Sequence, residues 1–338
     1  VVLWTPGRRH ARIGVLNQDV RLSRDAEGSG ERREAELASL SDVIQKRLHA
    51  SQNPPDCRSA RKLRCDLDKR CGFACQFHHV VYCLLVAYAN QRTLVLDSSN
   101  WSYSKRGWES VLLPVSERCT VNDVTQLVPW ADAVGRLDDV DTVDLPMIDV
   151  IEPRPDYLPE AVPADMARRL ARTHSHPSAW WVGQLADYLF KLQPELATEM
   201  RKVEAELDFA SPVVGVHVRR TDKVIKEALA YDTETYVEEV RRYDARRLHT
   251  LPTADNAPSK IYLATDDPEV LSSAKKKYAE YRLLATSEVT ASAGLDMRYT
   301  DASLRGVIRD VYFLSRTDYL VCHDVISRVQ AGLRTAQC

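Results

Sequence analysis

Two adjacent arginines, Arg219 and Arg220, directly follow the apolar run VVGVHV at residues 213–218. A short apolar run of this kind predicts a buried strand. Guanidinium groups present planar forks of N–H donors that clamp phosphate or diphosphate oxygens, and ligands of open parallel sheets bind beyond the carboxyl ends of the strands. The pattern therefore indicates a site for a phosphate-bearing ligand. The alternative, that both arginines form structural ion pairs, stays open at this point.

Acidic residues end a second predicted strand in the segment KIYLATDDPEV at residues 260–270. Asp267 precedes Pro268 and is typical of a helix N-cap, whereas Asp266 would bind sugar or ribose hydroxyls. A third acidic residue, Asp310, lies midway along a helix predicted at 301–315, with Thr300 or Asp301 as its cap. The sequence contains neither GxGxxG nor GxxxxGK[ST], so we expect no dinucleotide-binding or NTP-hydrolysing loop of the usual kind.

The cysteines suggest two kinds of site. Five of the eight fall in one stretch, and Cys119 follows them: Cys57, Cys65, Cys71, Cys75 and Cys83. One interpretation is a zinc site that uses Cys65, Cys71 and Cys75 with His78 or His79, although the spacing differs from paired CxxC clusters. The other is a local disulfide framework formed in an oxidising compartment. Cys71 and Cys75 would bridge across a single turn, but six cysteines allow about 15 pairings.

Composition excludes some classes of protein. The chain has 338 residues, with 46 Lys and Arg against 48 Asp and Glu, and a formal net charge of −2. This balance argues against a nucleic-acid binder, even with the lysine run at 275–277, which is typical of a solvated helix face. No apolar run approaches the ~20 residues that cross a bilayer. The sequence opens on Val1 without a secretory signal pattern, so we expect any membrane anchor to lie outside it.

Periodicity then predicts the elements that position these residues. An amphipathic helix is expected at 34–48, either a surface helix or the remnant of a coiled coil. A buried helix running into a strand is expected at 78–96, a strand at 142–150 and a proline-rich loop at 152–163. The remaining helical patterns cover 164–172, 178–192, 194–207, 233–249, 268–280 and 301–315, and strand candidates cover 213–218, 260–264, 282–285 and 319–322. Alternation of strands and helices predicts a parallel sheet covered on both faces.

Taken together, the motifs resemble the α1,6-fucosyltransferase family, which adds core fucose to N-glycans. The segments that carry the resemblance span roughly residues 32 to 322: NPPDC (53–57), RCGFACQFHHVVYC (70–83), QRTLVL (91–96), NWSYSKRGWE (100–109), LPMID (145–149), PRPDYLP (153–159), GVHVRRTDKV (215–224), YLATDDP (262–268), SAGL (292–295) and SLRGVI (303–308). The VRRTDK motif alone is less specific, because a wider fucosyltransferase superfamily approximates it.

The resemblance implies an α/β protein with an open α/β acceptor-side domain and a Rossmann-like nucleotide-sugar domain in a GT-B-like arrangement. The expected division is a flexible segment at 1–33, a stem helix at 34–52, a disulfide-containing α/β domain at 53–211, a GDP-fucose-binding domain at 212–322 and an aberrant tail at 323–338 without an SH3-like domain. The stem helix would mediate a homodimer. The expected location is the Golgi lumen, with a membrane anchor in the native protein.

The implied reaction moves L-fucose from GDP-fucose to O6 of the innermost Asn-linked GlcNAc, with inversion at the fucose anomeric carbon. No metal and no other cofactor are implied. The partners are the donor and a glycoprotein N-glycan. The alternative function is a catalytically silent fragment that binds GDP or glycan. After DYLVC the family continues with a Ser-Ser-Gln segment that lines the donor site, whereas this sequence reads HDVISRVQAGLRTAQC. Cys338 is a poor positional match for the cysteine that pairs with Cys322 in the family.

The resemblance also assigns roles to residues. Arg219 and Arg220 match the pair that holds the diphosphate, and Glu227 matches the proposed general base, although Ile225 and Lys226 replace a smaller, glycine-containing turn before it. The other matched positions are His217 and Asp310 at guanine, Tyr103 at the donor, Asp222, Lys223, Tyr236, Asp266 and Asp267 as important for activity, and Lys69 and Asp149 on the acceptor side. The implied disulfides are Cys57–Cys119, Cys65–Cys83 and Cys71–Cys75.

The assignment of Glu227 generates a first prediction. A carboxylate has to take the proton from the attacking hydroxyl group. Glu227→Gln removes the base without changing the size of the side chain, so it should abolish fucose transfer and leave GDP binding intact. Single-turnover transfer and GDP titration of the same preparation measure the two effects. Turnover retained by the variant contradicts the assignment.

Overall fold

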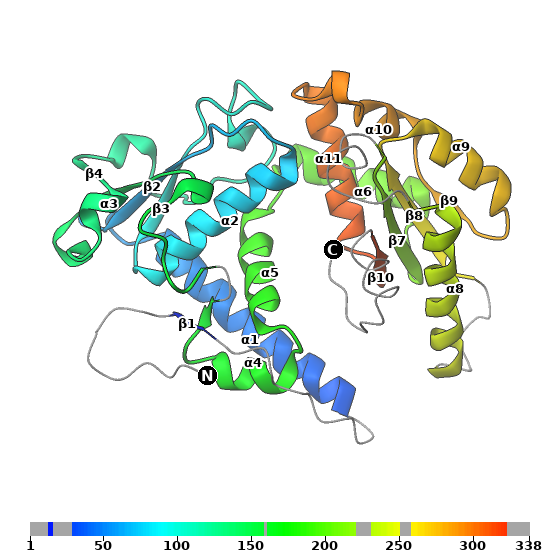
Figure 1. Cartoon of the computed structure of the whole chain (residues 1–338), viewed down its shortest axis with the longest axis horizontal. Coiled ribbons are helices and arrows are strands. Elements are labelled where there is room, and N and C mark those ends of the chain that lie inside the picture. The colour runs from blue at the N-terminus through cyan, green and yellow to red at the C-terminus, as the bar shows by residue number, and fades with distance from the viewer. Residues whose placement is uncertain (1–12, 16–28, 159–160, 221–230, 251–257, 323–338) are drawn as a thin grey trace. The chain divides into compact units, whose positions relative to one another are not determined.

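Residues 13–15, 29–158, 161–220, 231–250 and 258–322 are described by a computed structural model (Figure 1). The chain divides into two compact units, Val1–Gln193 and Pro194–Cys338. The sequence predicted the domain change between 211 and 212; the structure divides the chain earlier and gives helix α6 (Pro194–Leu207) to the second unit. Tyr312 and Arg305 in that unit bind Glu204 and Glu199 of α6, at 3.1 and 2.9 Å.

The first unit is built on a four-stranded parallel sheet. Its order is β3 (Thr93–Asp97), β2 (Lys62–Asp66), β5 (Thr142–Leu145) and β4 (Leu127–Pro129). The central strand β2 was missed from the sequence, because Lys62, Arg64 and Asp66 make it look polar. Leu63 and Cys65 between them are fully buried. The predicted strand at 142–150 ends at Leu145 because Pro146, which has no N–H to donate, follows it.

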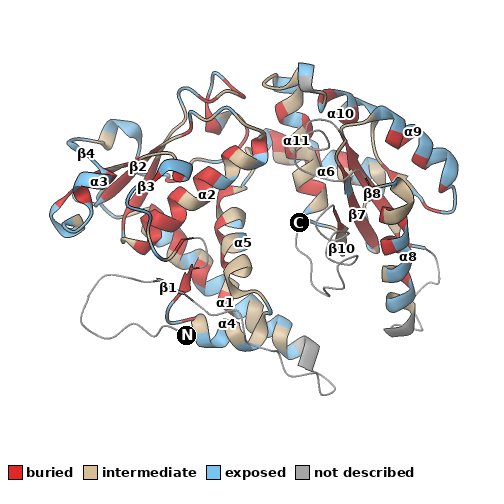
Figure 2. Ribbon diagram, in the orientation of Figure 1, coloured by how far each residue is buried: buried red, intermediate tan, exposed pale blue. Residues whose placement is uncertain are grey.

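Helix α2 (Phe73–Ala89) supplies much of the core of this unit, as its buried surface in Figure 2 shows. The predicted buried helix followed by a strand is confirmed in α2 and β3. The helix ends at Asn90, whose side-chain amide donates to the Val86 carbonyl at 2.8 Å. Gln91 then takes a left-handed conformation with a φ of 53°, which turns the chain toward β3.

Helix α1 (Ser29–Gln52) contains the predicted amphipathic stripe and begins earlier than expected. Its apolar residues Leu40, Ile44 and Leu48 are fully buried. They face helices of the same unit, α4 (Ala167–Thr173) and α5 (Pro177–Leu189). Val43 is the apolar residue of the stripe that is exposed. The apolar stripe of α1 therefore packs against helices of the same chain, as predicted for a surface helix. The homodimer through this helix stays a prediction.

Short elements complete the first unit. Strand β1 (Ile13–Val15) pairs antiparallel with β6 (Ala161–Pro163), so part of the segment predicted to be flexible, and part of the predicted loop at 152–163, are strands. The others are α3 (Trp130–Ala133) and the 3-10 turns η1 (Trp108–Ser110), η2 (Val121–Asp123), η3 (Leu137–Asp139) and η4 (Ile148–Val150). None of the helices in the described part of the chain has the length and hydrophobicity to span a bilayer.

The second unit is a second four-stranded parallel sheet, with the order β10, β7, β8 and β9. The strands are β7 (Val213–Val218), β8 (Lys260–Thr265), β9 (Leu283–Leu284) and β10 (Tyr319–Val321). Its other elements are α8 (Thr233–Thr250), α9 (Pro268–Lys277), α10 (Ser287–Ser292), η5 (Leu295–Met297) and α11 (Asp301–Leu314). These follow the predicted alternation closely. The two parallel sheets confirm the predicted α/β class, and the GT-B-like arrangement of the units stays a prediction.

The strand order of the second unit predicts where a ligand would bind. From β7 the chain adds β8 and β9 on one side, and then returns to place β10 on the other side of β7. Strand order therefore reverses between β7 and β10. Such a switch point leaves a crevice outside the carboxyl ends of the strands, which is where open parallel sheets bind ligands.

Gly215 in β7 allows helix α11 to end close to the sheet. A Cβ at this position would lie 2.9 Å from Thr317 Oγ1 and 3.0 Å from both Leu314 and Leu320. Gly215→Ala should therefore force these packed groups apart and lower the free energy of unfolding by about 1–3 kcal/mol. Urea denaturation measures the change.

Gly183 is a matched control. It is exposed in α5 and would have nothing within 4 Å of an added Cβ. Gly183→Ala should raise the free energy of unfolding by about 0.5–1 kcal/mol, because alanine favours a helix. An equal and small effect of both variants would contradict the close packing at Gly215.

Candidate active site

The arginine pair lies at the switch point of the second sheet. Val218 of β7 pairs with Thr265 of β8, so the residues that follow each strand lie side by side. The Asp266 carboxylate accepts the Arg220 backbone N–H at 2.7 Å, and its other oxygen lies 4.0 Å from Arg219 Nε. The structure therefore uses Asp266 to hold the arginine turn. A further contact of Asp266 with donor hydroxyls stays a prediction.

Asp267 has the predicted capping role. It is the N-cap of α9, and its carboxylate accepts the Glu269 backbone N–H at 2.8 Å. Pro268 occupies the first helical position, where a missing N–H costs nothing. Thr300 likewise caps α11, through its hydroxyl group and the Ser303 N–H. Both capping predictions are confirmed, and Asp267 needs no donor contact to explain its position.

Asp310 lies on α11, which packs on β7 and β8. Its carboxylate accepts the Tyr262 hydroxyl group at 2.9 Å, and the Tyr262 ring stacks on Phe313. Burial raises the pKa of Asp310 to about 7, and this hydrogen bond opposes the shift only in part. Burial also raises the pKa of Tyr262. Tyr262 was missed as a site residue, although it begins the YLATDDP segment.

The other predicted donor-side residues of the second unit lie around the arginine turn. His217 is exposed on β7, two residues before Arg219. Tyr236 is buried on α8, where burial raises the pKa of its hydroxyl group and the positive charge of Arg220 opposes that shift. This electrostatic effect indicates that Arg220 lies near Tyr236. Asp222, Lys223 and Glu227 fall outside the described residues, so their roles stay predictions.

The two predicted acceptor-side residues meet in the first unit. The Lys69 ammonium group forms an ion pair with the Asp149 carboxylate, although the residues are 80 positions apart in the sequence. Lys69 follows β2, and Asp149 lies in η4 beyond β5. The Asp149 side chain is 60% exposed and is therefore open to a ligand. Because β2 and β5 are parallel neighbours, both residues lie at the carboxyl edge of this sheet.

Tyr103 has a structural contact in the same unit. It is buried, and its hydroxyl group accepts the Phe73 backbone N–H at 3.1 Å. Phe73 is the first residue of α2, and Gly72 before it has no side chain to cap the helix. Tyr103 therefore caps α2 from a distant loop. Its predicted contact with the donor is not explained by this position and stays a prediction.

The cysteines form disulfides and not the alternative zinc site. The bridges are Cys57–Cys119, Cys65–Cys83 and Cys71–Cys75, the pairs that the resemblance implied. They consume every cysteine thiolate that the zinc interpretation required, so this interpretation was wrong. His79 lies beside the Cys65–Cys83 bridge, with its Nε2 atom 3.3 Å from Cys65 Sγ. Cys322 is also disulfide-bonded, and the predicted poor match of Cys338 as its partner falls outside the described residues.

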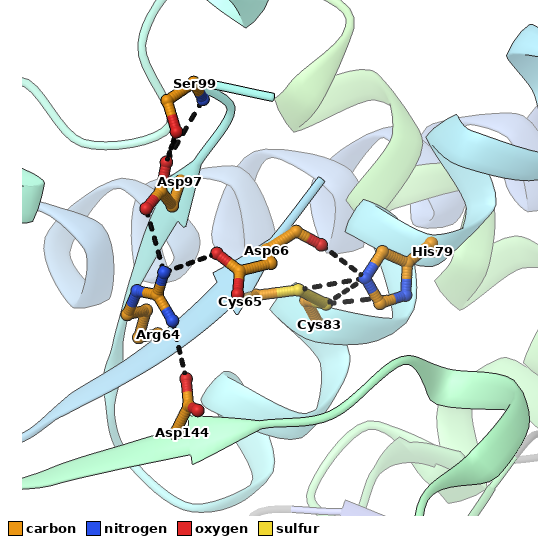
Figure 3. Close-up of polar contacts among 8 residues, drawn as sticks. All are labelled: Arg64, Cys65, Asp66, His79, Cys83, Asp97, Ser99 and Asp144. Carbon is orange, nitrogen blue, oxygen red and sulfur yellow. Dashed lines mark hydrogen bonds and ion pairs between the residues drawn. A yellow bond between two sulfur atoms is a disulfide. The ribbon is translucent and has the colours of Figure 1, made fainter. Parts of the chain in front are cut away.

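Arg64 organises a cluster at the carboxyl edge of the first sheet that sequence reasoning missed (Figure 3). Its guanidinium group binds Asp66 at 2.6 Å, Asp97 at 2.9 Å and Asp144 at 3.0 Å. Burial opposes the charge of Arg64, but these hydrogen bonds raise its pKa overall. The four residues come from the adjacent strands β3, β2 and β5. The sequence did contain a signal for this strand: in KLRCD (62–66) charged and apolar residues alternate, which places the charged side chains on one face.

These features define an α/β protein whose second unit carries two adjacent arginines, Arg219 and Arg220, at a switch point of its parallel sheet. The sequence matches the family of alpha-(1,6)-fucosyltransferase N- and catalytic domains over residues 8–329. The chain belongs to this family, which confirms the resemblance.

Two curated relatives agree with this membership. The chain is 43% identical over 316 residues to an alpha-(1,6)-fucosyltransferase of Drosophila melanogaster, and 37% identical over 317 residues to one of Caenorhabditis elegans. The alignments cover 94% and 92% of this chain but 50% and 55% of those proteins, so it spans about half the length of these curated relatives. The fucosyltransferase NodZ from Bradyrhizobium is similar in structure, with 16% identity and a TM-score of 0.44 over 78% of this chain and 89% of NodZ.

The raised pKa of Asp310 generates a prediction for stability. The pKa is about 7 in the folded chain against an ordinary value of 3.8, so between these values the folded state holds a proton that the unfolded chain releases. The stabilisation is present below about pH 4 and is lost as the pH rises through 7, by up to ~1.4 kcal/mol per pH unit. Asp310→Asn should remove this dependence.

Urea denaturation of both proteins from pH 4 to pH 8 measures the effect. The variant should gain stability relative to the original chain as the pH rises to 7, and the difference should then level off. Asp187→Asn, which removes an exposed carboxylate from α5, controls for the loss of a charge. Parallel curves for the original chain and Asp310→Asn would contradict a raised pKa.

Proposed function

We propose that this chain transfers L-fucose from GDP-fucose to O6 of the innermost Asn-linked GlcNAc of N-glycans, with inversion at the anomeric carbon. The family membership supports fucosyl transfer. The observation that carries the donor assignment is the position of Arg219 and Arg220 at the switch point, with their turn fixed by Asp266. Donors held in advance at a site of developing charge stabilise a transition state without reorganising.

The chemistry follows from where charge develops. Breaking the bond between fucose C1 and the diphosphate builds negative charge on the leaving oxygen, which the guanidinium groups of Arg219 and Arg220 stabilise. Positive charge develops on the sugar ring, as in glycosidic bond cleavage. The hydroxyl group of the acceptor attacks from the opposite face and gives its proton to a base, for which Glu227 is the predicted residue. We propose that the two arginines supply the cationic charge and that no metal is required.

Asp310 fits recognition of guanine. An ionised carboxylate accepts hydrogen bonds, and the guanine ring offers two neighbouring N–H donors on one edge. Burial disfavours the ionised form in the free protein. Donors from the base would replace the lost hydration of the carboxylate, so binding of GDP would bring its pKa down. In the first unit, Lys69 and Asp149 offer a cation and an exposed carboxylate for hydroxyl groups of the acceptor.

The disulfides support the proposed compartment. Three bridges within the first unit require an oxidising environment for their formation, as in the secretory pathway. We propose the Golgi lumen, where nascent N-glycans are processed. Mass spectrometry of the unreduced protein isolated from that compartment would show the three bridges.

The function is tested with GDP-fucose and a GlcNAc-terminated Asn-linked glycopeptide, without added metal. The acceptor should gain the mass of one deoxyhexose, with the linkage at O6 of the innermost GlcNAc. Transfer to another position or sugar contradicts the acceptor assignment. If the acceptor gains no mass, GDP titration decides between a chain that binds the donor without transfer and one that lacks the donor site.

Variants of the arginine pair test the donor site directly. Arg219→Ala and Arg220→Ala should each weaken GDP binding and lower the transfer rate by about 10²–10³-fold, the usual cost of removing one such donor. Arg201→Ala, an exposed arginine on α6, is the control and should change neither quantity. GDP affinity unchanged in both variants would rule out the proposed role of the pair, even in a preparation without turnover.

A further inference from the structure

His79 is a buried residue that the proposed reaction does not use. It lies on α2 and is 1% exposed. Its Nε2 atom lies 3.0 Å from the Asp66 carbonyl oxygen, as Figure 3 shows, and its Nδ1 atom lies 3.4 Å from the Ile148 backbone nitrogen. The ring therefore bridges two backbone segments that are 82 residues apart in the sequence, since 148 − 66 = 82.

These two partners fix the proton on the ring. A carbonyl oxygen only accepts and a backbone N–H only donates. His79 is therefore neutral, with its proton on Nε2 and a lone pair on Nδ1 that accepts the Ile148 N–H. A protonated ring would present two donors and lose the Ile148 bond. Burial lowers the pKa of His79, which is consistent with the neutral form.

The two backbone groups lie next to the acceptor-side pair. Asp66 ends β2 three residues before Lys69, and Ile148 begins η4 immediately before Asp149. The pairing of β2 with β5 ends at Cys65 and Leu145, so the two segments no longer pair with each other, and Asp66 pairs only with Asp97 of β3. Pro146, which follows Leu145, has no N–H to extend that ladder. The His79 ring forms the next link between the segments.

The ion pair alone would not fix this geometry. Exposed ion pairs contribute only about 0–1 kcal/mol, because water screens them and long side chains lose entropy. Asp149 is 60% exposed, whereas the His79 residue that makes these hydrogen bonds is 1% exposed. Asp66 is held a second time, because its carboxylate binds Arg64 at 2.6 Å. The Cys65–Cys83 bridge ties α2 to β2 beside the ring.

We propose that neutral His79 is the positioning residue of the acceptor site: it holds the two segments that carry Lys69 and Asp149 at the spacing that the acceptor glycan requires. This inference rests on the proposed function, which assigns the pair to the acceptor. His79 itself touches no substrate. It sets acceptor affinity through the backbone, and donor affinity is independent of it.

The test uses the full chain and measures binding without turnover. The probes are the GlcNAc-terminated Asn-linked glycopeptide and GDP, each titrated by calorimetry. His79→Phe fills the space of the ring but makes neither hydrogen bond, and should weaken glycopeptide binding about tenfold or more, in line with the loss of one to two hydrogen bonds. His79→Gln retains a donor for the Asp66 carbonyl and should lose less. GDP affinity should stay unchanged in both.

Two controls separate the inference from the function on which it rests. Lys69→Met removes the cation of the pair and should weaken glycopeptide binding; if it does not, the acceptor assignment fails. If Lys69→Met weakens binding and His79→Phe does not, the function stands and the role of His79 is overturned. His78→Phe, at the exposed neighbouring position, should bind both probes as the original chain does. Equal losses of GDP and glycopeptide binding in His79→Phe also overturn the proposal.

A measurement on the unsubstituted chain covers the case in which the variants fail to fold. The ¹⁵N chemical shifts of the His79 ring distinguish the two neutral tautomers and the charged form. The proposal requires the tautomer with the proton on Nε2 at pH 7. A proton on Nδ1, or a charged ring, would break the link to Ile148 and overturn it.

Discussion

The proposed sites depend on one constraint: beyond the carboxyl edge of a parallel sheet, other contacts have to hold the chain in place. Parallel strands end together at this edge, and beyond it the backbone has no ladder of hydrogen bonds to fix its course. Both units meet this constraint with buried or half-buried side chains. Asp266 fixes the turn that carries Arg219 and Arg220, and His79 links the segments that carry Lys69 and Asp149. In each case one side chain sets the position of neighbouring groups that we propose to bind a ligand.

The same logic explains why charge gathers at these edges without destabilising the fold. Arg64 binds three carboxylates from three adjacent strands, so none of them lies unpaired beside the core. Asp310 is the opposite case. Among the described residues, the Tyr262 hydroxyl group is the one donor that hydrogen-bonds to its carboxylate. Burial raises the pKa of Asp310 to about 7, and this one hydrogen bond offsets the shift only in part. This supports our proposal that Asp310 receives a ligand that brings its own donors.

Much of the second unit was predictable. Its strands and helices alternate with clear periodicity, and proline, threonine and aspartate mark the helix starts at Asp267 and Thr300. The first unit was harder to predict. Strand β2 carries three charged residues in five and was missed, yet it is an inner strand of its sheet. Lys62 donates to the Ala60 carbonyl, and Arg64 pairs with Asp66 at the carboxyl edge. The predicted apolar stripe of α1 was found, but its partners α4 and α5 lie far along the chain.

The sequence by itself determined the family, the disulfide pairs that the family implied and the residue types that we expect to bind diphosphate and hydroxyl groups. These are properties of local pattern and of motif identity. The tertiary structure decided which groups meet: that Asp266 serves the arginines, that Tyr103 caps a distant helix, and that Lys69 reaches Asp149 across 80 positions. It also decided the state of His79, because the tautomer of a histidine depends on its two partners, and these come from separate strand ends. Contacts of this kind are set by strand order, which no local pattern encodes.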